Sequence, residues 1–280
     1  MKEETLEIAN RFKISLIFIL VILTYLPTFA WMRERFLALE SYYTHGWLVP
    51  FICLWLVYRK KKNLKKITIK PAISGLFILI FGLFAHILGL ASQIKFVSGF
   101  SLVFVLLGLS LYLAGKDYTK EILFAILFLV FMVPLPRVLI IHISFRMKLL
   151  AAEAGTSLIN WFNIPAYRAG SIVYLPNTSL TIGSPCSGLR SLISLTALGA
   201  LFAYLSDLPK VKKIILFISA IPLALAANIL RIGMLLWVAY VYGHDVAIGR
   251  FHDISGVLVF IFAIMGLMII NRILQWKPKE

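Results

Sequence analysis

A cysteine, an arginine and a histidine in the C-terminal part of the chain could together perform covalent acyl transfer. Cys186 lies where a polar stretch gives way to a long apolar one, and Arg231 and His252 interrupt or border later apolar stretches. A thiolate attacks a carbonyl carbon, a histidine moves the proton, and an arginine can bind the oxyanion that forms. The sequence has neither Cys and His pairs at zinc-ligand spacing nor a Gly-rich phosphate loop, so we expect no metal and no cofactor.

The residues around Cys186 favour a role for its thiol. Pro185 suits the first turn of a helix, so we expect Cys186 in the first turn of an apolar helix, where the helix dipole lowers a thiol pKa. Ser187 and Gly188 are small and leave room for a substrate backbone. Arg190 follows four residues later on the same helical face, where it could hold a thiolate, bind a substrate carboxylate or reach lipid phosphates. The alternative is a boundary cysteine that only packs.

Arg231 lies well inside the apolar run 214–241. A charge near the middle of a membrane span costs about 2.5–3.5 kcal/mol on insertion scales, so such residues usually face a partner or a watery cavity. Asn228 comes three residues earlier, on the same helical face. The catalytic interpretation is a cation that binds an oxyanion, and the alternative is a structural ion pair, although acidic residues occur in the predicted spans only at the boundary positions Glu121 and Asp253.

His252 borders the last apolar run and could act as general base and acid, because histidine titrates near neutral pH. His244 lies in the same short connection and is a rival for this role. The alternative is that a lone histidine at such a boundary is simply a polar residue.

The elements that would position these residues are membrane helices. Of the 280 residues, 61% are hydrophobic and 14% charged, whereas a soluble domain carries about 25% charged residues. The apolar stretches are long enough to cross a bilayer as helices. We therefore predict an all-α, polytopic membrane protein forming one integral membrane domain over residues 1–280, with about eight spans. The predicted spans are 12–30, 46–58, 71–91, 96–115, 121–140, 186–206, 212–241 and 253–272.

A long connection, residues 141–185, separates the fifth and sixth predicted spans. Residues 141–160 resemble an amphipathic surface helix. In 169–182, two segments of alternating pattern flank Pro176 and Asn177, which is typical of a β-hairpin. The hairpin could hold an extended peptide by strand addition, or it could simply cap the bundle. The catalytic candidates then fall on the predicted helices of 186–272.

The net charge of +16 is mostly a topology signal. Seven lysines and arginines lie between residues 59 and 70, and most others fall at connections on the same side of an eight-span arrangement. The positive-inside rule then places both termini in the cytoplasm and Cys186, Arg231 and His252 towards the outer side of the cell (inner) membrane. We expect lipid headgroups as partners rather than nucleic acid. The first apolar run is expected to remain as an uncleaved span.

Several segments resemble the exosortase and archaeosortase family of membrane transpeptidases. These are Cys-Ser-Gly-Leu-Arg-Ser at 186–191, Asn-Ile-Leu-Arg-Ile at 228–232, His-Asp-Ile-Ser-Gly at 252–256, Tyr-Thr-His-Gly at 43–46 and Pro-Leu-Pro at 134–136. The resemblance implies catalytic roles for Cys186, Arg231 and His252, with Arg190, Asn228, Ser187 and Gly188 binding substrate or supporting the site. Archaeal members carry arginine where His252 stands, so the chain is more similar to the bacterial exosortases.

The resemblance also implies a substrate class. Family substrates are secreted proteins whose C-terminal sorting signal combines a short motif such as Pro-Glu-Pro, a transmembrane helix and a basic tail. The enzyme is expected to cleave near the motif through a Cys186 thioester and to pass the new C-terminus to a lipid or glycan acceptor. Three other functions remain open on the sequence: a multispan transporter, a non-catalytic assembly factor for polysaccharide export, and an intramembrane protease that releases its product to water.

Overall fold

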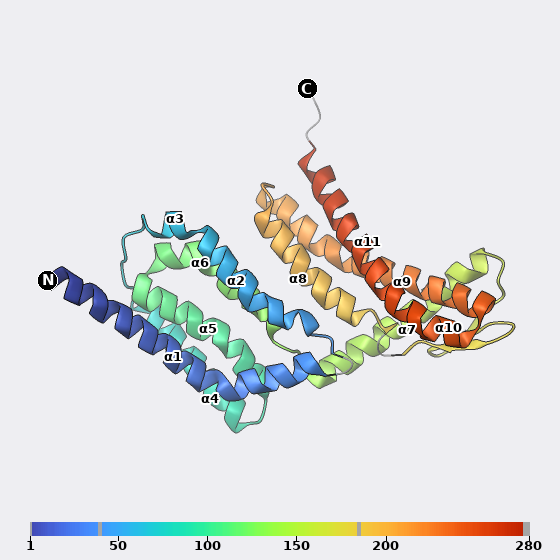
Figure 1. Cartoon of the computed structure of the whole chain (residues 1–280), viewed down its shortest axis with the longest axis horizontal. Helices are drawn as coiled ribbons and strands as arrows, with labels where there is room; N and C mark the ends of the chain where they lie inside the picture. The colour runs from blue at the N-terminus through green and yellow to red at the C-terminus, as the bar shows by residue number, and fades with distance from the viewer. Residues whose placement is uncertain (1, 39–40, 184–185, 277–280) are drawn as a thin grey trace. The chain divides into compact units, whose positions relative to one another are not determined.

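The computed structural model describes residues 2–38, 41–183 and 186–276 and is almost entirely helical (Figure 1). This confirms the predicted all-α class. The α-helices are α1 Lys2–Leu37, α2 Leu48–Arg59, α3 Lys61–Leu64, α4 Ser74–Ala91, α5 Lys95–Ala114, α6 Lys116–Phe128, α7 Arg137–Trp161, α8 Leu189–Leu205, α9 Lys210–Tyr242, α10 His244–Ile248 and α11 Arg250–Gln275. Two 3₁₀ turns, η1 Thr44–Trp47 and η2 Leu129–Met132, precede α2 and follow α6.

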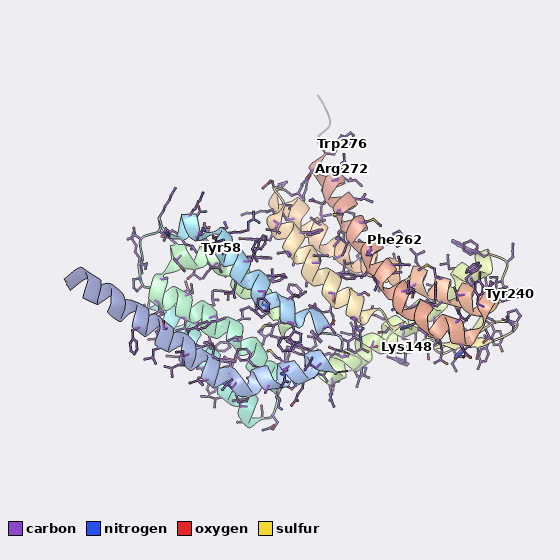
Figure 2. All side chains as sticks on the ribbon, in the orientation of Figure 1. Tyr58, Lys148, Tyr240, Phe262, Arg272 and Trp276 are labelled. Carbon is purple, nitrogen blue, oxygen red and sulfur yellow. The ribbon has the colours of Figure 1, made fainter. Side chains whose placement is uncertain are left out.

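Five helical segments are long and apolar enough to cross a bilayer, and there are six if α6–η2 and α7 form one broken span. The five are Ser15–Leu37, Ser74–Ala91, Lys95–Ala114, Lys210–Tyr242 and Ile254–Gln275. Large apolar side chains project outward from them, among them Phe262 of α11, which is 58% exposed (Figure 2). The chain is a multi-pass membrane protein. The predicted count of eight is not confirmed, because α2 and α8, at 12 and 17 residues, are shorter than a typical span.

The predicted fifth span, 121–140, is wrong in its second half. The helical segment that contains its first half ends at Met132, and α7 begins at Arg137. Pro134 and Pro136 lie between them, and proline both lacks an N–H donor and disfavours helical geometry in the preceding residue. The predicted surface helix, 141–160, is therefore part of a longer helix that starts directly after the second proline.

The backbone contacts divide the chain into two compact units, one comprising the described residues of 1–39 and 44–134 and the other those of 40–43 and 135–280. In the first unit, glycines bring α4 and α5 close together: a Cβ added at Gly108 would lie 2.4 Å from the backbone N of Leu79. A buried polar chain joins α1, α4 and α5, since the Ser98 hydroxyl lies 2.9 Å from His86 Nδ1 and 2.5 Å from the hydroxyl of Thr28.

The second unit contains every candidate catalytic residue. Helices α8, α9 and α11 lie side by side (Figure 1) and share a core of small and aliphatic side chains. That core includes Leu195, Ala220, Ala224, Ala263 and Leu267. A second core lies where α7, α9 and the small sheet meet, and its members include Val173, Leu180, Ile182, Ile232 and Leu236.

The sheet has three short antiparallel strands in the order β1 Tyr167–Ala169, β2 Ile172–Tyr174 and β3 Ser179–Thr181. The predicted hairpin around Pro176 and Asn177 is the β2–β3 pair. Strand β1 was not predicted. It pairs with β2 through a tight turn at Gly170, whose φ of +63° suits glycine.

Candidate active site

The side chains of Cys186, Arg231 and His252 meet at one point in the second unit. His252 Nε2, from the first turn of α11, lies 2.9 Å from Cys186 Sγ. Nη2 of Arg231, from the C-terminal half of α9, lies 3.1 Å from the same nitrogen. Three separate segments thus bring together the thiol, base and cation that the sequence analysis selected.

Cys186 does not lie in the first turn of the long apolar helix α8, contrary to expectation, but in 3₁₀ conformation ahead of it. Helix α8 begins three residues later at Leu189, after Gly188 with a φ of +79°. The Cys186 N–H instead donates to the Gly183 carbonyl at 3.1 Å. Pro185, on which the expectation rested, lies outside the described residues. The helical spacing that was to bring Arg190 to the face of the cysteine therefore does not apply, and Arg190 is exposed.

The surroundings of Cys186 raise the pKa of its thiol rather than lower it. Burial raises the pKa of the Cys186 thiol above its ordinary value, and the positive charge of Arg231 offsets this in part. The expected lowering of this pKa is wrong, because the cysteine precedes α8 and is largely enclosed. A neutral thiol needs a base to become a nucleophile, and His252 Nε2 is at hydrogen-bonding distance.

Arg231 fixes the state of the histidine. A guanidinium only donates hydrogen bonds, so His252 Nε2 must accept the bond from Arg231 Nη2. The neutral ring then carries its proton on Nδ1 and presents the Nε2 lone pair to both the thiol and the guanidinium. In that tautomer the imidazole can take a proton from Cys186.

A serine that the sequence analysis gave no role holds Arg231 in place. Ser255 Oγ accepts a hydrogen bond from Arg231 Nε at 3.3 Å and donates to the His252 carbonyl at 2.9 Å. Arg231 Nη2 also donates to that carbonyl at 3.0 Å. Ser255 is fully buried. Its position three residues after His252, on the same helical face, is the signal that could have identified it.

Asn228 supports the segment that carries the cysteine. Its Nδ2 donates to the Cys186 carbonyl at 3.3 Å, and its side chain fills the space beside Gly188. Ser187 is fully buried, and its Oγ accepts a hydrogen bond from the Leu189 N–H at 3.4 Å. Ser187 and Gly188 thus pack against the protein itself, and the room expected there for a substrate backbone is filled.

His244, the rival histidine, does not contact the thiol. It begins α10, is exposed, and lies 3.3 Å from Asp245 through Nδ1. In the described part of the chain, no cluster of three His, Cys, Asp or Glu side chains could hold a metal ion.

A pocket of about 180 Å³ opens beside the thiol. Cys186 and His252 form one part of its wall, and the rest is mostly apolar. The remaining lining residues are Leu180, Thr181, Ile182, Gly183, Leu235, Ala247 and Ile248.

Residues 31–269 match the family described as transmembrane exosortase (Exosortase_EpsH), a range that contains Cys186, Arg231 and His252. No curated protein and no solved structure matches the chain.

Proposed function

We propose that this chain, which belongs to the transmembrane exosortase family, cleaves the C-terminal sorting signals of secreted proteins with Cys186 as its nucleophile. The family consists of membrane protein-sorting transpeptidases. The observation that carries the proposal is the 2.9 Å contact between Cys186 Sγ and His252 Nε2, with Arg231 Nη2 3.1 Å from the same nitrogen.

In the first step, His252 Nε2 takes the thiol proton and Cys186 Sγ attacks the carbonyl carbon of the scissile peptide bond. The S–C bond forms as the carbonyl electrons move to oxygen. When the oxyanion collapses, the C–N bond breaks and His252 returns the proton to the leaving amine. The products are a thioester on Cys186 and the released C-terminal segment.

Arg231 supplies the charge that the oxyanion needs. In the resting site, its Nη2–H donates to the His252 Nε2 lone pair. Once Nε2 holds the thiol proton, that lone pair is gone and the Arg231 N–H is released towards the developing oxyanion. Ser255 keeps its bond to Arg231 Nε throughout, so the guanidinium turns about a fixed point.

The second step resolves the thioester. A lipid or glycan nucleophile gives its proton to neutral His252 and attacks the thioester carbon. The C–S bond breaks, and the thiolate recovers the proton. The basic connections support cytoplasmic termini and an active site on the outer side of the cell membrane, where secreted substrates arrive. Arg190, which is exposed, is available to an acidic residue of a sorting motif.

The test is processing of a co-expressed secreted protein with a C-terminal sorting signal. Cys186→Ala should abolish the size shift of this substrate while the enzyme stays in the membrane, and Cys53→Ala should leave it intact. Cys53 is the matched control, since it is the other cysteine and is buried in α2. Mass spectrometry of the wild-type protein should detect a thioester between Cys186 and the new C-terminus of the cleaved substrate. Processing by Cys186→Ala at the wild-type rate would refute the mechanism.

A further inference from the structure

The register of the small sheet leaves one row of backbone groups facing outward. The Ile182 N–H donates to the Ser171 carbonyl and the Leu175 N–H to the Thr178 carbonyl, both at 2.8 Å. Because hydrogen-bonded positions alternate along an antiparallel pair, residues 178, 180 and 182 use their backbone groups towards β2. Ser179 and Thr181 therefore direct their N–H and C=O groups to the other side of β3.

That other side is the edge of the sheet. Strand β3 is the last in the order β1-β2-β3. Among the described residues, no backbone hydrogen bond joins the outward groups of Ser179 or Thr181 to another segment. The side chains of both residues are exposed, while that of Leu180 between them is buried. An exposed edge of this kind is a template for pairing with another extended chain.

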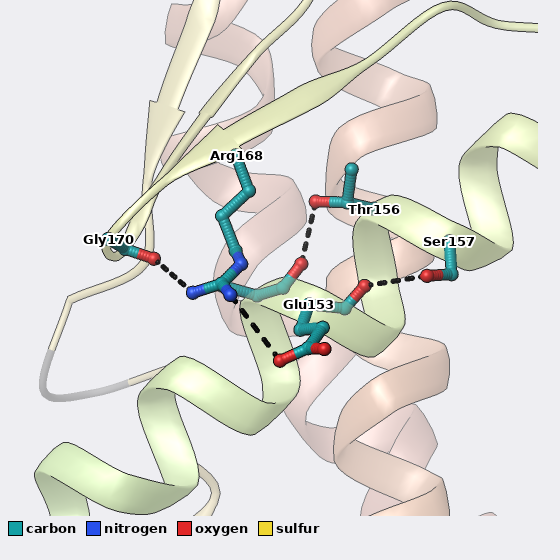
Figure 3. Close-up of polar contacts among 6 residues, drawn as sticks. Glu153, Thr156, Ser157, Arg168 and Gly170 are labelled. Atoms are coloured by element: carbon teal, nitrogen blue, oxygen red, sulfur yellow. Dashed lines mark hydrogen bonds and ion pairs between the residues drawn. The ribbon is translucent and has the colours of Figure 1, made fainter.

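The rest of the sheet is fixed to the helices around it. Beyond the opposite strand, Arg168 of β1 forms an ion pair with Glu153 of α7 at 3.4 Å (Figure 3). Asn160 of α7 exchanges two hydrogen bonds with the backbone of Ala166, at 2.8 and 3.1 Å. At the hairpin tip, Asn177 Nδ2 donates to the carbonyl of Tyr240 of α9 at 2.7 Å. The edge of β3 is thus held in place before anything binds to it.

The edge is continuous with the catalytic pocket. Thr181 lines the pocket together with Cys186 and His252. Gly183, two residues after Thr181, also lines the pocket, and its carbonyl accepts the Cys186 N–H. A peptide paired with β3 would therefore run directly to the thiol, and the mostly apolar pocket would receive one of its side chains.

We propose that the edge of β3 binds the substrate as an added strand, with the outward N–H and C=O of Thr181 pairing with the backbone next to the scissile bond. This inference rests on the proposed function for the identity of the peptide. The occupant is the extended segment of the sorting signal, and the pocket accepts an uncharged side chain from it. Main-chain pairing gives affinity for any sequence, and the pocket adds selectivity.

The test is binding of a synthetic peptide that carries the motif and cleavage site of a reporter that the wild-type protein processes. Binding is measured in the Cys186→Ala background, so it does not depend on catalysis. Thr181→Pro removes one outward N–H without removing any bond to β2, and proline is tolerated at an edge strand. We expect its Kd to rise about tenfold. Thr181→Val keeps the N–H and the branched shape, and its Kd should stay within twofold of the parent value.

A second measurement uses the enzyme without a change in β3. Peptides that carry a single N-methyl group at successive positions are titrated against the Cys186→Ala protein. A peptide paired as a strand directs every second N–H towards its partner, so affinity should fall at alternate positions only. Uniform sensitivity, or none, would refute strand addition even if Thr181→Pro failed to fold.

The outcomes separate this inference from the proposed function. If Thr181→Pro binds as Thr181→Val does, the edge is not the binding site, whatever Cys186 does. If Thr181→Pro changes only the oligomeric state, the edge pairs with a second copy of the chain and the inference is wrong. If the Cys186→Ala protein processes the reporter while the alternating N-methyl pattern holds, the catalytic proposal fails and the binding mode stands.

Discussion

Replacing Gly188 by alanine should damage the active site through Asn228. Gly188 has a φ of +79°, and a Cβ built on it would lie 2.5 Å from Asn228 Cγ. That separation is too short for two carbon atoms, so the asparagine must move. Its Nδ2 now donates to the Cys186 carbonyl at 3.3 Å, and movement of this side chain therefore releases the segment that holds the thiol beside His252.

The loss in free energy of unfolding that we expect for Gly188→Ala has two parts. A left-handed conformation costs a residue with a Cβ about 1–2 kcal/mol, and overpacking a filled site costs about 1–3 kcal/mol more. Gly170→Ala is the matched control for the first part alone, because Gly170 has a φ of +63° and its added Cβ would meet no atom within 4 Å. We expect Gly188→Ala to lower the free energy of unfolding by about 1–3 kcal/mol more than Gly170→Ala does.

A double-mutant cycle with Asn228→Ala tests the source of the difference. Asn228→Ala removes two of the three atoms nearest to the new Cβ, Cγ at 2.5 Å and Nδ2 at 2.8 Å, and keeps only Asn228 Cβ at 2.8 Å. The double variant should therefore lose about 1–3 kcal/mol less than the sum of the two single variants. In processing assays, Gly188→Ala should fall well below wild type, whereas Gly170→Ala should remain close to it.

The assays are unfolding in detergent micelles and initial rates of substrate processing. Equal destabilisation by Gly188→Ala and Gly170→Ala would show that no clash with Asn228 exists. The same conclusion would follow if the double variant lost as much unfolding free energy as the two single variants together. Either result would contradict the packing described for the segment that carries Cys186.

Two further predictions concern the catalytic groups. Ser255→Ala removes the hydroxyl that accepts the hydrogen bond from Arg231 Nε, so kcat should fall about tenfold to hundredfold with little change in KM. A general loss of structure would instead expose Cys186 and raise its alkylation rate, and a normal kcat would exclude the positioning role. Because burial raises the pKa of Cys186, its thiolate fraction at neutral pH is small, and in a Cys53→Ala background its alkylation by iodoacetamide should rise about tenfold per pH unit from pH 7 to 9. A rate that is already constant between pH 6 and 8 would instead indicate a preformed thiolate.

Secondary structure was predicted best from the sequence where a single chemical requirement acts over many residues. Long apolar runs predict helices because a bilayer leaves no other way to satisfy backbone groups. The hairpin around Pro176 and Asn177 was predicted because its signals are local. Strand β1 was missed, since three residues with no alternating pattern form a strand only when β2 is beside them.

The segment around Cys186 shows why site geometry was harder to predict. Pro185 suggested a helix start, but the turn of the backbone occurs at Gly188, whose positive φ is stabilised by close packing against Asn228. That contact joins residues forty positions apart, and no local pattern reports it. Ser255 was overlooked for a similar reason, because a serine on an apolar helix becomes significant only when Arg231 lies against it.

Helix α9 sets the distance between the segment that carries Cys186 and the tip of the β2–β3 hairpin. Asn228 near its middle holds the cysteine segment, and the carbonyl of Tyr240 near its end holds the hairpin tip. One residue inserted between them would turn everything beyond it by about 100° and advance it by about 1.5 Å. The relative position of the peptide-binding edge and the thiol would then change, although the chemical groups of each would still be present. The number of residues between Asn228 and Tyr240 is therefore as much a part of the site as the identity of Cys186.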